Sequence, residues 1–140
     1  MIIKKMKKIL KSQAAFSELV SSIVGLMVIT IMLVISIMFI KVVNHQSLLN
    51  QFAYQMSIEV CENGTTDSAE IDERYEQLKS SLGIAPTINY TTSYFIGKEV
   101  QFGELITVTA SSSIEFSIIG YPVIMDFEID KTGRSQIYWK

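Results

Sequence analysis

One histidine and one cysteine are the side chains of this sequence with the most versatile chemistry. His45 and Cys61 could act as the base and nucleophile of a thiol enzyme, or could share a metal ion. Both are predicted on one helix, sixteen residues apart, which at about 1.5 Å per residue separates them by about 24 Å. They cannot meet within one chain, so we expect a solvated His45. We expect Cys61 to be a small buried apolar side chain, with a reactive thiol as the alternative.

Two groups of carboxylates could bind calcium, but each has a structural interpretation that we favour. One group occupies the first half of a predicted short helix, where negative charge suits the helix dipole: Glu70, Asp72, Glu73 and Glu76. The other alternates along one strand face, where charge discourages aggregation of sheet edges: Asp126, Glu128 and Asp130. We therefore predict no metal site, no cofactor and no enzyme activity.

Glu18 is the acidic residue whose position needs a special explanation. It stands at the start of a long apolar run, where an ionised carboxylate is costly unless it is paired or reaches the membrane interface. One interpretation is that its side chain extends to the lipid headgroups. The other is that it pairs with a neighbouring subunit, for instance with a free N-terminal amine, and sets the register of assembly.

The run that follows Glu18 is long enough to cross a membrane. Residues 19–40 contain no charged side chain, and as a helix they would measure roughly 33 Å against a hydrocarbon core of about 30 Å. A buried core helix is the alternative, but such a helix normally shows a polar stripe. A cleaved signal peptide has a shorter apolar region and a small-residue cleavage site, so we predict a retained anchor.

Charge is divided unevenly around this run. Six Lys or Arg residues and thirteen Asp or Glu residues follow Lys41, whereas five lysines precede the run: Lys4, Lys5, Lys7, Lys8 and Lys11. Basic flanks stay in the cytoplasm. We therefore predict a cytoplasmic leader (1–18), a transmembrane helix (19–40) and an extracytoplasmic α+β domain (41–140) of a cell-membrane protein. The lysines suit anionic membrane lipid, and the acidic remainder argues against a nucleic-acid partner.

The helix is predicted to continue past the membrane, from about Gln13 to about Glu62. Its second half is amphipathic, with apolar residues at helical spacing: Leu49, Phe52, Ala53, Met56 and Val60. Asn63-Gly64 is a left-handed terminator. A short second helix follows, with Asp67 and Glu70 as a capping pair and Gly83 as its end. Its apolar stripe comprises Ile71, Tyr75, Leu78 and Leu82.

From Thr87 onward the pattern changes to alternation, which predicts an antiparallel meander of three to four strands. We expect strands at 87–96 and 104–116, with a bulge in Ser111–Ser113, and a third strand from Val123 to Asp130. Gly97-Lys98-Glu99 is a predicted turn and Gly120-Tyr121-Pro122 a break. Residues 135–139 could form a last short strand. In the third strand one face is apolar, with Val123, Met125, Phe127 and Ile129, and the amphipathic helix is expected to cover it.

Taken together, these features resemble the type IV pilin-like proteins, and TadE-like pseudopilins of Gram-positive bacteria in particular. The segment Ala14-Ala15-Phe16-Ser17-Glu18-Leu19 and the ending Thr132–Lys140 carry the resemblance. It implies a pilin-like fold, a prepilin peptidase that recognises the leader, and neighbouring subunits or assembly-platform proteins as partners. Gln13 would precede the cut, where members usually carry Gly and sometimes Ala, so a cleaved subunit and an uncleaved anchored subunit both stay open.

The function expected is that of a pilin-like structural or assembly subunit of a surface filament, secretion or conjugation apparatus. Glu18 would be neutralised by a neighbour, and Ser22 and Gly25 would let helices approach closely within the membrane. The alternative is a monomeric membrane-anchored module that binds a protein or a cell-wall ligand through its sheet.

Overall fold

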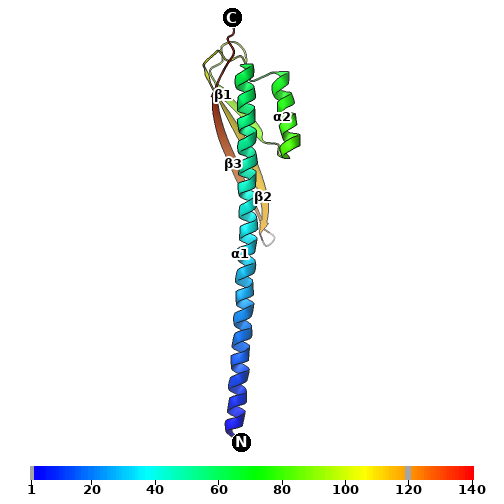
Figure 1. The fold of residues 1–140 in the computed structure, drawn as a ribbon, viewed down its shortest axis with the longest axis vertical. Helices are drawn as coiled ribbons and strands as arrows, with labels where there is room; N and C mark the ends of the chain where they lie inside the picture. The colour runs from blue at the N-terminus through cyan, green and yellow to red at the C-terminus, as the bar shows by residue number, and fades with distance from the viewer. Residues whose placement is uncertain (1, 119–120) are drawn as a thin grey trace. The chain divides into compact units, whose positions relative to one another are not determined.

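The computed structural model describes residues 2–118 and 121–140, and within these it contains two helices and a three-stranded sheet. In chain order the elements are α1 (Ile2–Asn63), α2 (Ala69–Leu82), β1 (Thr87–Thr92), β2 (Leu105–Ile118) and β3 (Tyr121–Arg134) (Figure 1). The predicted long helix, short second helix and antiparallel sheet are confirmed. The chain divides after Lys41 into an N-terminal unit and a C-terminal unit, Val42–Lys140.

α1 starts earlier than predicted, and its end agrees with the prediction to within one residue. It begins at Ile2 rather than near Gln13, because the lysine-rich leader has good helix propensity and contains no Gly or Pro. Its end at Asn63 is one residue beyond the predicted Glu62. Gly64 adopts a left-handed conformation with φ of 61°, and its N–H donates to the carbonyl of Val60 at 3.0 Å. The predicted left-handed terminator is confirmed.

α2 is capped by a different residue from the one predicted. Ser68, not Asp67, is the N-cap, and its hydroxyl accepts from the N–H of Ile71 at 3.4 Å. The preceding residues are already held by the loop at Lys98, whose carbonyl accepts from the N–H of Thr66 at 3.1 Å. This contact places the start of the helix one residue later. Gly83 ends α2 in the left-handed region, as predicted.

The sheet is an antiparallel meander in the order β1-β2-β3, with β2 in the centre. Both registers run without interruption, including Ser111–Ser113, which pair with Glu128, Phe127 and Asp126 in order. The predicted bulge is therefore wrong, because three small polar residues fit a regular ladder. β1 ends at Thr92 instead of Ile96, and the predicted turn at Gly97 and Lys98 follows it.

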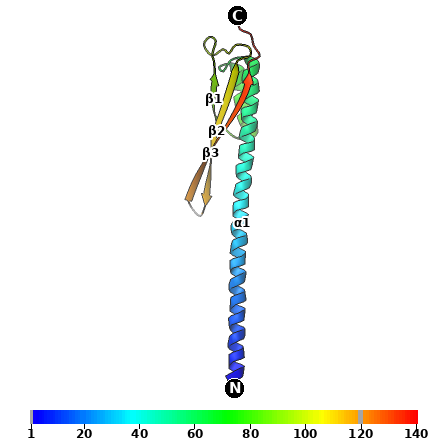
Figure 2. The ribbon, with the colours of Figure 1, turned by 90° about the vertical axis from the view of Figure 1, so that its left-hand side faces the viewer.

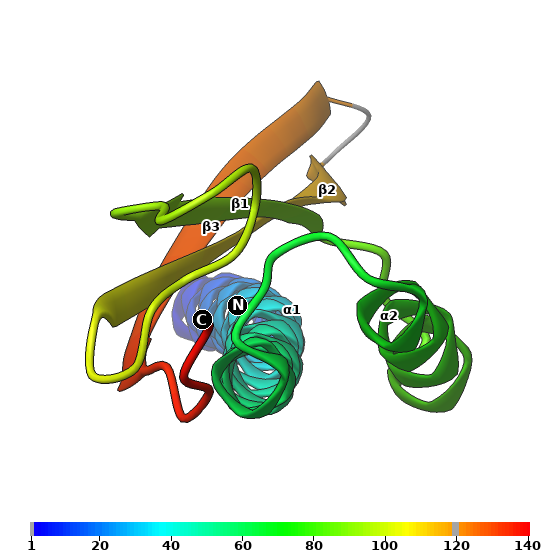
Figure 3. The ribbon, with the colours of Figure 1, turned by 90° about the horizontal axis from the view of Figure 1, so that it is seen from above.

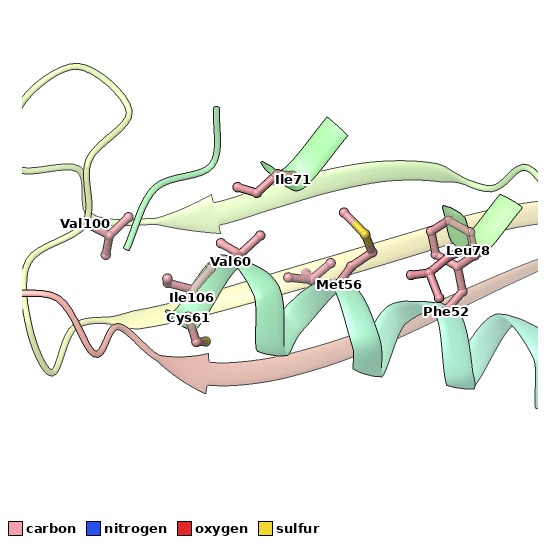
Figure 4. Packing of buried hydrophobic residues seen from close by; sticks show 9 residues of the cluster. Phe52, Met56, Val60, Cys61, Ile71, Leu78, Val100 and Ile106 are labelled. Atoms are coloured by element: carbon pink, nitrogen blue, oxygen red, sulfur yellow. The ribbon is translucent and has the colours of Figure 1, made fainter. Parts of the chain in front are cut away.

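The core of the C-terminal unit lies between the sheet and both helices. Figure 3 shows α1 and α2 on the same side of the sheet. The apolar stripe predicted for α1 is fully buried, and it packs against alternate residues of β2: Ile106, Val108 and Ala110. Ile71 and Leu78 complete the cluster from α2 (Figure 4). The expectation that the amphipathic helix covers the sheet is confirmed.

The third strand is only partly covered. Phe127 and Ile129 pack against the cluster of Leu49, Ala53 and Ala110, as the alternation predicted. Val123 and Met125 are exposed, although they share that face. Pro122 lies within β3, opposite Ser117, so the predicted break does not occur there; Gly120, the first residue of that predicted break, lies outside the described residues.

Residues 135–140 form no strand, which corrects the prediction of a fourth one. This tail instead crosses the C-terminal end of α1. The N–H of Gln136 donates to the carbonyl of Cys61 at 2.9 Å, and the indole Nε1 of Trp139 donates to the carbonyl of Gly64 at 3.0 Å. Ser135 is buried and donates to the carbonyl of Val100 at 2.8 Å. Through Gln136 the tail thus satisfies the Cys61 carbonyl, which the end of the helix leaves without an intrahelical partner.

Candidate functional site

The apolar half of α1 is not covered by any residue that the structure describes. Every described side chain from Ala15 to Ile37 is exposed. The most apolar eighteen residues have a mean hydropathy of 3.0, and none of them is buried. Among the described residues this is the one helix long and apolar enough to cross a membrane, so it is compatible with a membrane anchor.

Three hydroxyl groups of this helix donate to its own carbonyls. Ser22 donates to the carbonyl of Glu18 at 2.9 Å, Thr30 to that of Leu26 at 2.8 Å, and Ser36 to that of Met32 at 2.8 Å. This is the bonding that lets serine and threonine enter hydrocarbon without a polar partner. The helix therefore presents an apolar surface despite its polar residues.

Glu18 is exposed at the start of that surface. Among the described residues the ion pairs are Arg74 with Glu59 and Lys79 with Glu76, so none of these residues pairs with Glu18. Phe16, Ser17 and Gln13 beside it are exposed too. No described side chain forms an ion pair with this carboxylate.

Ser22 and Gly25 form a small-residue notch on the helix. They are three residues apart, and therefore on one face. A Cβ added to Gly25 would meet nothing within 4 Å, so the space over it is open. The side chains of five leader lysines and of Ala14 lie outside the described part of the chain: Lys4, Lys5, Lys7, Lys8 and Lys11.

His45 is not the solvated side chain that the sequence suggested. It is half-buried, its Nε2 shares a hydrogen bond of 3.2 Å with Ser112 Oγ, and its ring lies 5.6 Å from that of Phe127. Burial lowers the pKa of His45 below its ordinary value. The side chain joins α1 to β2 and β3, which a sequence with no register information could not reveal.

Cys61 is buried, as predicted, at the contact between α1 and β3. A Cβ on Gly133 would come closer to its Sγ than two such atoms can approach. Burial, and secondarily the charge of Glu62, raises the pKa of the Cys61 thiol. A raised pKa disfavours the nucleophilic thiolate, so the packing role accounts for this residue.

The two carboxylate groups lie on exposed surfaces. Within residues 2–118 and 121–140 no cluster of three or more His, Cys, Asp or Glu side chains could hold a metal ion. β3 is an edge strand, as its charges indicated, and Asp130 accepts from Thr109 Oγ1 at 2.7 Å. Its other two carboxylates border an open depression of about 320 Å³ on the sheet, which is lined by Thr87, Ser111, Ser112, Ser113, Asp126, Phe127 and Glu128.

One surface was not anticipated from the sequence. At the far end of the β2–β3 hairpin, apolar side chains are exposed on both faces of β3: Tyr121, Val123, Ile124 and Met125. The signal that could have found it is the absence of any charge from Phe116 to Met125. The alternation in the third strand predicts one covered face. The sequence does not show where the covering helix ends, so it does not reveal that Val123 and Met125 stay exposed.

Comparison with known proteins yields a family and no described relative. A search of curated proteins finds no match, and a search of solved structures finds none either. Residues 23–140, which include most of the apolar helix and the whole C-terminal unit, match DUF4320, a domain of unknown function. The chain therefore belongs to the DUF4320 family.

Proposed function

We propose that this protein is a membrane-anchored, pilin-like structural or assembly subunit of a surface filament, secretion or conjugation apparatus. In this proposal residues 19–40 cross the cell membrane once. The lysine-rich leader stays in the cytoplasm, and the C-terminal unit is presented outside. Pilin-like neighbours, assembly-platform proteins and a prepilin peptidase are its partners.

The observation that carries the proposal is the uncovered helix. An apolar surface extending from Ala15 to Ile37 must be covered by lipid or by other helices, because water would disfavour it strongly. The C-terminal unit has its own core and does not need this surface to fold. The helix is therefore available for contacts between subunits.

The proposed mechanism is lateral packing of such helices in the membrane. The notch at Ser22 and Gly25 lets two backbones approach, which favours association where no hydrophobic driving force exists. Glu18 then pairs with a cationic group of a neighbour, for instance an N-terminal amine. Because that carboxylate is costly near hydrocarbon when unpaired, only one register of the helices satisfies it.

Substitution of Glu18 tests this mechanism. Two differently tagged copies of the chain are expressed in the native host, and one is captured from solubilised membranes. We expect Glu18→Ala to reduce recovery of the second copy about tenfold, equivalent to a loss of about 1.4 kcal/mol of pairing. Proteins encoded by neighbouring apparatus genes should be lost with it.

The matched control is Glu62→Ala, which removes an exposed glutamate from the same helix in the C-terminal unit. It should leave recovery unchanged. Full recovery of the second copy and of the apparatus proteins with Glu18→Ala would contradict the proposal. Mass spectrometry of the mature N-terminus in that host shows separately whether the leader is cut after Gln13.

A second candidate function is a monomeric membrane-anchored module that binds a protein or a cell-wall ligand. The depression on the sheet favours it, because Ser111 and Ser113 line it together with two carboxylates on the same face. In that case Asp126→Asn should weaken binding of purified cell wall, Glu18→Ala should not change that binding, and no second copy should be recovered with either chain.

A further inference from the structure

At the far end of the β2–β3 hairpin, β3 exposes apolar side chains on both of its faces, while Glu115 and Ser117 of β2 lie beside them on the outward face. Tyr121, Val123 and Met125 lie on the face that packs against α1 further along the sheet, with exposed fractions of 75%, 39% and 41%. Ile124, on the opposite face, is 65% exposed. We call these four residues the hairpin tip. The face with Tyr121, Val123 and Met125 is uncharged and exposed, and an exposed apolar patch of this kind marks an interaction site.

Charge marks where the apolar surface ends. No charged residue occurs from Phe116 to Met125, and Glu115 and Asp126 stand on either side of this stretch. On the outward face of β3 the change is abrupt, from Ile124 at the tip to a row of carboxylates: Asp126, Glu128 and Asp130. With Glu115 opposite Ile124, the outward face is acidic as far as the tip, whereas the other face, with Tyr121, Val123 and Met125, carries no charge. An uncharged face with charges at its border suits a segment that meets lipid at the edge of water.

The C-terminal unit places this tip at the end where the chain enters it. As β2 advances from Ile106 to Ser112, its neighbours on α1 recede from Val60 to His45. β2 therefore runs along α1 in the direction opposite to the helix, beside its C-terminal part (Figure 2). The hairpin end therefore lies on the side of the C-terminal unit where the chain enters it, at Val42.

The reach of the hairpin follows from element geometry. From Ser112 to the end of β2 the strand continues for six residues, about 20 Å at about 3.3 Å per residue. From His45 back to Val42, the first residue of the unit, the helix advances only about 4.5 Å. The hairpin can therefore extend up to about 15 Å beyond the level of Val42.

We propose that the hairpin tip inserts into the interfacial layer of the same membrane that residues 19–40 span. This inference rests on the membrane anchoring in the proposed function. Because the C-terminal unit begins at Val42, directly after the proposed span, chain connectivity keeps the tip within reach of that bilayer in every copy. Tyrosine and aliphatic side chains suit that layer, and the flanking carboxylates limit the depth of insertion. A second copy of the chain is the competing occupant.

Depth-dependent fluorescence quenching tests the proposal on the full chain. Cys61 is first replaced by alanine, and an environment-sensitive fluorophore is then attached to Ile124→Cys or to Tyr121→Cys. The protein is reconstituted, one copy per disc, into phosphatidylcholine nanodiscs that contain lipids with nitroxides at shallow or deep positions. The control carries the fluorophore at Glu128→Cys, on the same face of β3 and about 13 Å further along.

We expect shallow nitroxides to quench the fluorophore at Ile124 or Tyr121 roughly two-fold, because interfacial segments lie about 5–10 Å into the headgroup and acyl boundary. Its emission should shift to shorter wavelength, and high salt should change neither result because the tip is uncharged. The fluorophore at Glu128 should behave as in water.

Three outcomes would overturn the proposal. If the fluorophores at 124 and 121 match the control at 128, the tip lies in water. If the emission of these fluorophores shifts to shorter wavelength only in nanodiscs that hold several copies, a second copy covers the tip. A further fluorophore at Met27→Cys separates the two levels of inference: if deep nitroxides quench it and the tip stays unquenched, only this inference fails. If Met27 is not quenched either, the membrane anchoring itself fails.

Discussion

At the scale of single residues, the contact between Cys61 and Gly133 sets how closely α1 approaches β3. A methyl group at position 133 would overlap Cys61 Sγ, so Gly133→Ala should destabilise the folded C-terminal unit by about 1–3 kcal/mol. Urea unfolding of the detergent-solubilised chain measures this change. Replacing Cys61 by alanine in the same chain should recover most of the loss, as expected for two residues in direct contact. Additive effects of the two substitutions would contradict the packing role.

His45 should make the stability of the C-terminal unit depend on pH. Burial lowers its pKa below the ordinary 6.5, so the folded chain binds fewer protons there than the unfolded chain. The stability from this difference is present above pH 6.5 and is lost as the pH falls through 6.5 toward the folded pKa. The measurement is the difference in unfolding free energy between wild type and His45→Gln at about pH 7.5 and at about pH 5.5. The stability advantage of the wild type over His45→Gln should be smaller at the lower pH. An advantage that stays constant, or that grows in acid, would contradict the half-buried position of His45.

At the scale of elements, the start of α2 depends on Ser68. Its hydroxyl accepts a backbone N–H of the first turn, so Ser68→Ala should cost about 1 kcal/mol of unfolding free energy. Asp67→Ala is the matched control, because its side chain makes no cap, and it should change stability by less than about 0.5 kcal/mol. A larger loss of stability with Asp67→Ala than with Ser68→Ala would support the predicted capping pair of Asp67 and Glu70.

At the scale of the whole molecule, the proposed orientation in the membrane rests on the division of charge around the apolar run. Protease added to intact cells should digest the C-terminal unit and spare a tag placed before Lys4, because basic flanks are retained in the cytoplasm. Replacing the five leader lysines by glutamine should reduce the fraction of chains in this orientation. Digestion of the leader with a protected C-terminal unit would show that the orientation is reversed.

Much of the fold could be predicted from local pattern. The helical spacing from Leu49 to Val60 identified the buried stripe of α1, since one face of a helix must be apolar to form a core. Gly64 and Gly83 marked helix ends because a left-handed residue there carries little penalty for glycine. The unbroken apolar run marked the helix that is compatible with an anchor. These features depend on residues that are near one another in the chain.

The candidate site was only partly predictable. Glu18, Ser22 and Gly25 could be chosen because an apolar run makes any polar or small residue in it conspicuous. What those residues contact could not be derived, because in the proposed assembly their partners belong to other molecules. The choice between Asp67 and Ser68 as the cap of α2 was also out of reach. It depends on a loop bond to Lys98, more than thirty residues away.

The sequence alone determined which segments are helical or extended and which faces of them are apolar, because these properties follow from periodicity and from the conformational limits of Gly and Pro. Only the tertiary structure decided that His45 contacts Ser112, that Cys61 rests on Gly133, and that the tail caps α1 instead of adding a strand. It also decided that Tyr121 and Ile124 stay exposed. These contacts depend on strand register and on how far the helix follows the sheet, and both are set by packing between residues distant in the chain.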